Sequence, residues 1–204
     1  MSDVPNTCHT AVASLGRRQR RNLARFAAAP LLCVGMLSVA ACADGNDRAE
    51  VAISAEEVTE AQLAWGEGII AIGEVSVAGG DVEAAATAHI DEFYAYGGDD
   101  PVLFKPTLAS EDRFRTTFEG ALSYFIGTAG TEDYGFALNP WVAVRWENEG
   151  TILGSDTALA MGKYYFTDVD GNETVAEYAF AYVKDADGNL KINLQHSSLP
   201  FEPN

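Results

Sequence analysis

The sequence predicts an α+β fold in which helices come first and an antiparallel sheet of long strands follows. From residue 54 to residue 126, apolar residues recur with the period of a helix, in segments that follow capping residues and end at glycines. From residue 136 onward the period changes to two, which is typical of strands with one buried face. Asp-Gly-Asn sequences at 170–172 and 187–189 separate the later apolar runs, as hairpin turns do.

Three helices are expected, and a capping residue precedes each of them. Ser54-Ala-Glu-Glu57 has the pattern of a capping box, in which two side chains satisfy the free amides of a helix start. Asp81 can cap the second helix, and Thr116 or Thr117 can cap the third. The helices should therefore span about 55–77, 82–96 and 118–126.

The strands begin with a short extended segment, Val102 to Thr107, which Pro106 confines to an edge or an end of the sheet. Gly150 is expected to turn the chain between the first two long strands. The second of these is expected to bend or bulge at Gly154 or Gly162. The long strands should span 136–148, 151–167, 173–184 and 190–198. The two Asp-rich hairpin sequences also resemble the opening of calcium loops, but neither has a glutamate at the twelfth position, so we interpret them as turns.

The first 41 residues are expected to be an export signal that is removed. Five arginines precede an apolar run of 15 residues, Phe26 to Ala40, which is shorter than the roughly 20 residues that cross a membrane. The run ends in Val39-Ala-Ala-Cys42, which resembles the lipobox of bacterial lipoproteins, where the cysteine is acylated and becomes the N-terminus. Ala43 follows rather than aspartate, and by resemblance to Gram-negative lipoproteins this favours a periplasmic protein anchored in the outer membrane. A plain secretory signal and a mitochondrial transit peptide are the alternatives.

The residues after the predicted signal, 42–204, have a length that suits one domain. Residues 42–53 are small and polar and should form a tether, and residues 54–204 should form the domain. From Cys42 onward the chain has 8 basic and 29 acidic residues, a net charge of about −21. Such a surface repels nucleic-acid phosphates, so binding to DNA or RNA is not expected.

Cysteine and histidine are too scarce for several kinds of site. Once the signal is removed and Cys42 carries a lipid, no thiol remains for disulfides, thiolate metal sites or nucleophilic catalysis. Only two histidines remain, His89 and His196, so a zinc site with three histidines cannot form within one chain.

Five local motifs together resemble the iota-class carbonic anhydrases, which have the nuclear-transport-factor-2-like (NTF2-like) cone fold, with helices against a curved antiparallel sheet. The resemblance extends from about Ala55 to Pro200. Its most specific marks are Phe-Lys-Pro-Thr at 104–107 and His-Ser-Ser-x-Pro at 196–200. Many members carry two successive histidines before the serine pair, and here the first is Gln195. The motifs are Val102-Leu-Phe-Lys-Pro-Thr107, Ala121-Leu-Ser-Tyr-Phe-Ile-Gly127, Gly135-Phe-Ala-Leu-Asn-Pro-Trp141, Met161-Gly-Lys-Tyr-Tyr-Phe-Thr-Asp168 and Leu194-Gln-His-Ser-Ser-Leu-Pro200.

The resemblance implies the reversible hydration of CO2 to bicarbonate. Some members are described as metal-dependent and others as working without a metal. Because the chain has so few histidines, we favour a reaction without any cofactor, and manganese or zinc is the alternative. Cone folds of this kind commonly pair their sheets, so a homodimer is expected by analogy.

The candidate site residues are hydroxyl groups and one imidazole. Hydration of CO2 needs a held water and donors for the negative charge that grows on the oxygens, and hydroxyls can serve both needs. We assign substrate and product binding to Thr107, Tyr124 and Ser198, with Ser197 as the alternative serine. His196 would orient them or move the proton, because an imidazole changes charge near neutral pH. Leu194 shares a strand face with His196 and Ser198, so that face is expected to point into the pocket.

Each of these residues also has a purely structural interpretation. His196 could be a structural histidine, Tyr124 could belong to the core, and Thr107 could cap a turn. The competing functions are a non-enzymatic cone that binds a small ligand or assembles subunits, and a related enzyme with a larger organic substrate. An enzyme for CO2 requires the hydroxyl groups to converge in one cavity, whereas a binding or assembly module does not.

Overall fold

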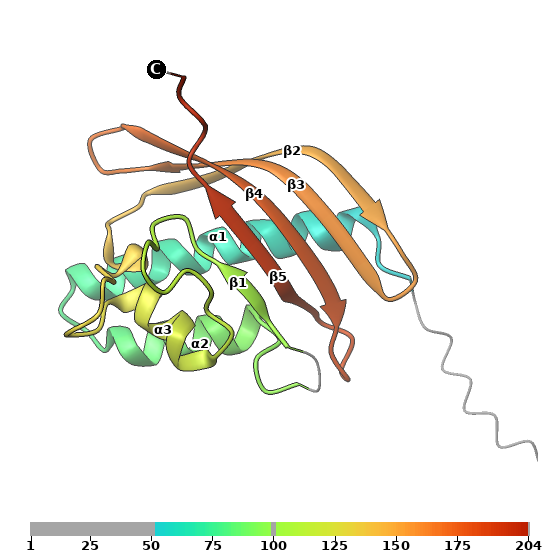
Figure 1. The fold of residues 1–204 in the computed structure, drawn as a ribbon, viewed down its shortest axis with the longest axis horizontal. Coiled ribbons are helices and arrows are strands. Elements are labelled where there is room, and N and C mark those ends of the chain that lie inside the picture. The colour runs from blue at the N-terminus through green and yellow to red at the C-terminus, as the bar shows by residue number, and fades with distance from the viewer. Residues whose placement is uncertain (1–51, 99–100, 204) are drawn as a thin grey trace, which may run out of the picture. The chain divides into compact units, whose positions relative to one another are not determined.

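The computed structural model describes residues 52–98 and 101–203, which form one compact unit (Figure 1). The predicted export signal, Cys42 and residues 42–51 of the tether lie outside the described residues. Ile53, which we assigned to the tether, is buried in the hydrophobic core. The elements are α1 (Ala55–Val77), α2 (Val82–Phe93), β1 (Leu103–Lys105), α3 (Phe118–Ile126), a 3-10 turn η1 (Phe136–Leu138), β2 (Ala143–Leu153), β3 (Thr157–Thr167), β4 (Glu173–Lys184) and β5 (Leu190–Ser198).

Helix α1 begins where the capping box predicts. The backbone amide of Glu57 donates to Ser54 Oγ at 3.1 Å, and the amide of Ser54 donates to the Glu57 carboxylate at 2.7 Å. The two bonds satisfy amides that a helix start otherwise leaves unpaired. Helix α3 spans the predicted residues, with Thr117 as its cap.

Helix α2 starts after the predicted cap, Asp81, but ends three residues earlier than predicted. Tyr94 is already extended and forms a parallel bridge with Ile192 of β5. The tertiary contact with the sheet therefore overrides the helical pattern of the sequence at this end.

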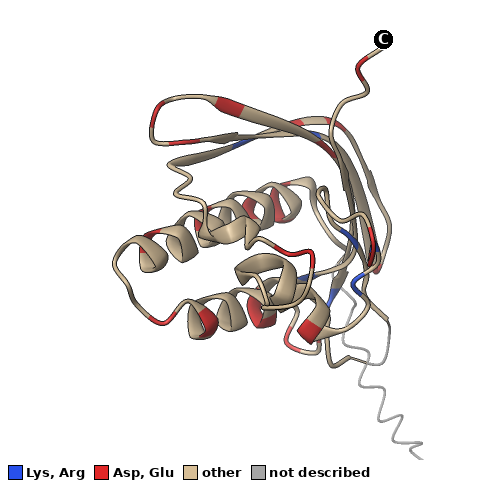
Figure 2. Cartoon of the chain, turned by 60° about the vertical axis from the view of Figure 1, so that its left-hand side comes forward, with Lys and Arg blue, Asp and Glu red and all other residues tan. Residues whose placement is uncertain are grey.

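The sheet has the strand order β1-β5-β4-β3-β2, with β1 parallel to β5 and the other neighbours antiparallel. All three helices lie on one side of it (Figure 1), and the sheet bends around them (Figure 2). The core between the two layers is rich in aromatic rings, with Trp65 of α1 in contact with Tyr164, Phe166 and Phe180 of the sheet. This is the α+β arrangement that the sequence predicts.

The first two long strands differ from the prediction. Residues 136–138 form a 3-10 turn rather than a strand, and β2 continues through Gly150 to Leu153. The turn lies at Gly154, whose amide donates to Thr157 O at 2.8 Å. Gly150 instead follows a bulge, because the register shifts between Asn148 and Gly150. The bulged backbone crosses Gly162 so closely that a Cβ there would lie 2.1 Å from Glu147 O.

A second bulge decides which side of β5 faces the helices. Tyr182 pairs with Ile192 and Ala181 pairs with Leu194, so Asn193 is an extra residue in the strand. The extra residue inverts the alternation of side chains beyond it. Gln195 and Ser197 are therefore buried, whereas His196 is exposed and Ser198 is half-buried on the other face. Our expectation that His196 and Ser198 face the pocket is wrong for this reason.

No helix among residues 52–98 and 101–203 is both long enough and apolar enough to cross a membrane.

Candidate active site

Four hydroxyl residues line one small cavity beneath the sheet, and Tyr164 of β3 is one of them. Thr107 follows β1, Tyr124 lies in α3, and Ser197 lies near the end of β5. The cavity measures about 10 Å³, close to what a single water molecule occupies. Its wall consists of Trp65, Phe104, Pro106, Thr107, Tyr124, Phe125, Phe136, Tyr164, Gln195 and Ser197.

A much larger pocket of about 500 Å³ adjoins this cavity and shares Thr107, Tyr124 and Phe136 with it. Apolar side chains, among them Leu138, Trp141, Phe166 and Leu199, make up much of its lining. An uncharged apolar gas such as CO2 can therefore enter through this pocket without losing favourable hydration. Glu132 and Asp133 add negative charge to the same wall.

Local backbone geometry explains why Thr107 and Ser197 lie close together. Phe104 and Lys105 pair with Gln195 and His196 in parallel register, so the residues after β1 run beside the end of β5. Lys105 Nζ also donates to Ser197 O at 2.8 Å and ties the two strands together there. Pro106, which has no amide to donate, ends β1 and is followed directly by Thr107.

The turn at Gly135 shapes the part of the cavity wall that Phe136 forms. Its φ of 83° lies in the left-handed region, and a Cβ would lie 2.8 Å from the carbonyl carbon of Ile126. The turn brings Phe136 against Tyr124, with the ring centroids 5.8 Å apart and the planes nearly parallel. The stack holds the Tyr124 ring at the junction of the two cavities.

A chain of buried hydrogen bonds orients Ser197. Tyr164 OH and Ser197 Oγ share a short hydrogen bond, and Gln195 Nε2 donates to the same Oγ at 3.4 Å. Tyr94 OH donates to Gln195 Oε1 and accepts from Trp65 Nε1 at 3.1 Å. Because its oxygen is occupied by Tyr94, Gln195 presents its NH2 group to Ser197. This is the position that a histidine holds in many iota-class members.

The tyrosines of the site stay protonated at neutral pH. Burial raises the pKa of Tyr124 above its ordinary value, and hydrogen bonding with the Leu108 backbone and the Thr107 hydroxyl only partly offsets this effect. Burial likewise raises the pKa of Tyr164, against hydrogen bonds to Ser197, Thr107 and Gln195. Both phenols therefore act as hydrogen-bond donors at neutral pH rather than as bases.

The structure brings together part of the predicted site. Thr107, Tyr124 and Ser197 line the small cavity, whereas His196 and Ser198 lie on the opposite face of the sheet. The sequence analysis missed Tyr164 and the orienting roles of Gln195 and Tyr94. The alternation of β3, with Tyr164 and Phe166 on one face, was the available signal for Tyr164. No comparable signal exists for Tyr94, which the helical pattern placed in α2.

Residues 52–98 and 101–203 contain no group of three or more histidine, cysteine, aspartate or glutamate side chains arranged to hold a metal ion. His89 is enclosed by aromatic rings of Trp65, Phe93 and Phe125 and lies apart from the hydroxyl residues.

Residues 56–199 match the family model described as metal-independent carbonic anhydrase. A metal-independent carbonic anhydrase of Nostoc sp. is 40% identical over 199 residues, which cover 89% of this chain and 97% of the relative. The crystal structure of a cyanobacterial iota-carbonic anhydrase in complex with bicarbonate is 43% identical, with a TM-score of 0.72 over 74% of this chain and 95% of the other.

A more distant neighbour is an NTF2-like superfamily protein from Salmonella enterica, which is 10% identical with a TM-score of 0.41 over 72% and 96% of the two chains. The α+β fold that we predicted is shared with the cyanobacterial iota-carbonic anhydrase. The match of the family model and the identity over most of both sequences show that this chain belongs to the metal-independent carbonic anhydrases.

Proposed function

We propose that this chain catalyses the reversible hydration of CO2 to bicarbonate without a metal, at the cavity lined by Thr107, Tyr124 and Ser197. One observation carries the proposal beyond family membership. Hydroxyl groups from four elements of the fold, including Tyr164, converge on a space that holds about one water beneath an apolar pocket. A binding or assembly module has no need for this convergence.

The chemistry follows from the chemical character of the groups. CO2 enters through the apolar pocket, and the hydroxyl of Thr107 accepts a hydrogen bond from the water in the small cavity. Ser197 Oγ already accepts from Tyr164 and Gln195, so the hydroxyl of Ser197 donates its hydrogen bond into the cavity. The water oxygen attacks the carbon of CO2, one C–O bond forms, and one C=O π bond opens. Tyr124 donates a hydrogen bond to the oxygen that becomes negative, which stabilises the transition state more than neutral CO2.

The proton of the attacking water leaves to solvent through the open pocket. The phenols cannot accept it at neutral pH because burial raises their pKa values. Glu132 cannot hold it either, because hydrogen bonds from Ser110 and the following amides lower its pKa to about 2. The exposed position of His196 leaves it without contact to the water, so we no longer assign it a role in the reaction.

Stopped-flow measurement of CO2 hydration by the purified protein tests this site. Thr107→Val, Tyr124→Phe and Ser197→Ala each remove one hydroxyl with little change of shape. Each should lower kcat by about 100- to 1000-fold, the range seen when one oxyanion donor is lost. His196→Ala and Ser198→Ala are matched controls on the other face and should retain activity. Full activity in the triple variant would disprove the site, and activity lost on chelation and restored by zinc or manganese would disprove the metal-free mechanism.

We also propose a homodimer formed through the outer face of the sheet. Leu159 and Met161 of β3 and Ile152 of β2 are large, exposed and on this face, with Leu159 directly opposite Ile152. Alanines of β4 flank them, opposite Leu159 and Met161. Monomeric proteins seldom expose contiguous apolar patches of this kind, which supports a second copy as the occupant.

The lipid anchor at Cys42 and the periplasmic, outer-membrane location are a further proposal, supported by the order of basic, apolar and small residues before Cys42. Labelling of the expressed protein with a fatty-acid analogue should be lost in Cys42→Ser. Labelling that persists in this variant would disprove the anchor.

A further inference from the structure

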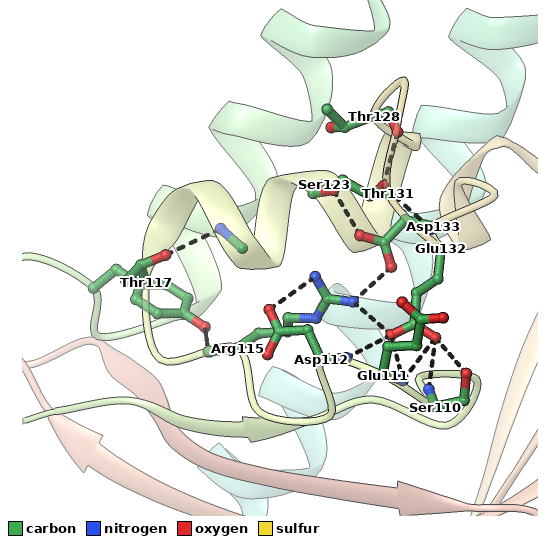
Figure 3. Close-up of polar contacts among 12 residues, drawn as sticks. Ser110, Glu111, Asp112, Arg115, Thr117, Ser123, Thr128, Thr131, Glu132 and Asp133 are labelled. Atoms are coloured by element: carbon green, nitrogen blue, oxygen red, sulfur yellow. Dashed lines mark hydrogen bonds and ion pairs between the residues drawn. The ribbon is translucent and has the colours of Figure 1, made fainter.

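A buried ion pair lies beside the site and joins the two segments that carry the Thr107 and Tyr124 hydroxyls (Figure 3). Arg115 Nη2 lies 2.7 Å from Asp133 Oδ1, and the two side chains are 4% and 1% exposed. Asp133 Oδ2 accepts a hydrogen bond from Ser123 Oγ at 2.6 Å. One carboxylate therefore binds the loop after β1 with one oxygen and helix α3 with the other.

The first of these segments is the loop of residues 106–114, which begins with Pro106 and Thr107. Its two ends are joined because the amide of Arg115 donates to Phe104 O at 2.7 Å. Its tip is held by Glu132, which accepts hydrogen bonds from the amides of residues 110–112 and from Ser110 Oγ. Tyr96 OH also donates to Arg115 O at 2.6 Å. The loop is thus held at its base, at its tip and by the guanidinium of Arg115.

The second segment is α3, where Ser123 immediately precedes Tyr124. The bond from Ser123 to Asp133 restrains the turn of helix that carries the Tyr124 phenol. That phenol shares the wall of the small cavity with Thr107 and the wall of the larger pocket with Thr107 and Leu108, both at the start of the loop. The relative position of the two hydroxyls is therefore set by how the loop and α3 are held together.

We infer that Asp133, with Arg115 and Ser123, is a positioning residue for the reaction, which holds the Thr107 and Tyr124 hydroxyls at the separation that the water and CO2 require. The inference rests on the proposed function of these hydroxyls. None of the three residues lines the small cavity, and all of them act through Thr107 and Tyr124. A shift of about 1 Å between such groups can cost about 100-fold in rate.

We call the cluster of Arg115, Ser123 and Asp133 the clip. Two variants weaken the clip with little change in side-chain volume. Ser123→Ala removes the bond to α3 and places the best helix former in the helix. Asp133→Asn keeps the shape and removes the nearest of the three carboxylate charges that pair with Arg115, the others being Asp112 and Glu132 at 3.6 Å. We expect kcat for CO2 hydration to fall about 10-fold in the first and about 100-fold in the second, with a smaller change in KM for CO2, because the three residues lie outside the small cavity although Asp133 lines the larger pocket.

A double-variant comparison separates positioning from general damage. In a Tyr124→Phe background there is no phenol to align, so Ser123→Ala should cause little further loss of kcat. Ser54→Ala is the matched control, because it removes the cap of α1 and lowers stability without contacting the site. It should lower the melting temperature and leave kcat unchanged.

A readout independent of activity comes from protein labelled with 13C-tyrosine. The ring-carbon resonance beside the Tyr124 hydroxyl, assigned by its absence in Tyr124→Phe, should shift in Asp133→Asn and Ser123→Ala but not in Ser54→Ala. If neither the resonance nor kcat changes in the two clip variants, the positioning inference is wrong. Hydration by the wild-type protein would then still support the proposed function. Equal losses of kcat with and without the Tyr124 hydroxyl also overturn it. Absent wild-type hydration with a shifted resonance overturns the function alone.

Discussion

Gln195 shows how a single side chain can take over a position that the family often gives to histidine. Its amide oxygen accepts from Tyr94 and its NH2 group donates to Ser197, so both ends of the amide are used. A neutral imidazole also offers one donor and one acceptor, which makes the replacement chemically conservative. The departure from the family pattern therefore leaves a donor beside Ser197.

The burial of His89 makes the stability of the fold depend on pH. It is 4% exposed, neither ring nitrogen has a hydrogen-bond partner among the described residues, and burial lowers its pKa to about 3. The unfolded chain binds a proton at this imidazole below its ordinary pKa of 6.5, whereas the folded chain stays neutral. Stability is therefore unaffected above pH 6.5 and falls as the pH decreases from there towards 3.

We expect the free energy of unfolding to fall by about 2 kcal/mol between pH 7 and pH 5 because of His89, from the slope of about 1.4 kcal/mol per pH unit. Urea unfolding at the two pH values measures this change. Carboxylates contribute little in this window because their ordinary pKa values lie lower. His89→Phe should flatten the dependence, and an equally steep fall in that variant would show that another group is responsible.

At the scale of elements, two bulges decide where the chemistry lies. The extra residue Asn193 turns Ser197 inward and His196 outward. The bulge before Gly150 brings the backbone of β2 over Gly162, so only a residue without a side chain fits there. Both bulges change the direction of side chains without changing where the strands begin and end.

Gly162→Ala should destabilise the protein by about 1–3 kcal/mol, the usual cost of overpacking, because its Cβ would meet the carbonyl oxygen of Glu147. Thermal unfolding measures the effect. Gly150→Ala is the matched control on the facing strand, since a Cβ there meets no atom within 4 Å. Equal melting temperatures for the two variants would contradict the close crossing.

For the whole molecule, the net charge favours solubility, whereas the apolar surface of the sheet favours association. Acidic residues greatly outnumber basic ones and are spread over helices, loops and strands (Figure 2), which favours solubility. The outer face of the sheet nevertheless exposes Leu159, Met161 and Ile152 together. A second copy would cover this face and leave the pocket on the helical side open.

Leu159→Lys should shift the protein from dimer to monomer in sedimentation velocity, because the lysine charge would have to be buried in the proposed interface. Val77→Lys is the matched control, since Val77 is an exposed apolar residue at the end of α1. A wild-type protein that sediments as a monomer, or an unaffected Leu159→Lys dimer, would contradict the proposed interface.

The sequence by itself determined the fold class, the caps of α1 and α2, the bounds of α3, β4 and β5, and the family. These depend on local chemistry: a capping box, a glycine stop or a run with period two acts within a few residues. The hydroxyls Thr107 and Tyr124 were also available from the motifs. The sequence could not show the early end of α2, which follows from a bridge to β5 more than ninety residues away.

Only the tertiary structure decided which serine lines the small cavity. A strict alternation along β5 predicts His196 and Ser198 inside, and one extra residue at Asn193 reverses it. A bulge depends on the pairing of two strands, so the sequence of one strand does not reveal it. The convergence of Tyr164, Gln195 and the Arg115–Asp133 pair around the hydroxyls is likewise a property of packing between distant segments. For that reason the motifs predicted the reaction, and the fold shows which of the predicted hydroxyl groups share a cavity.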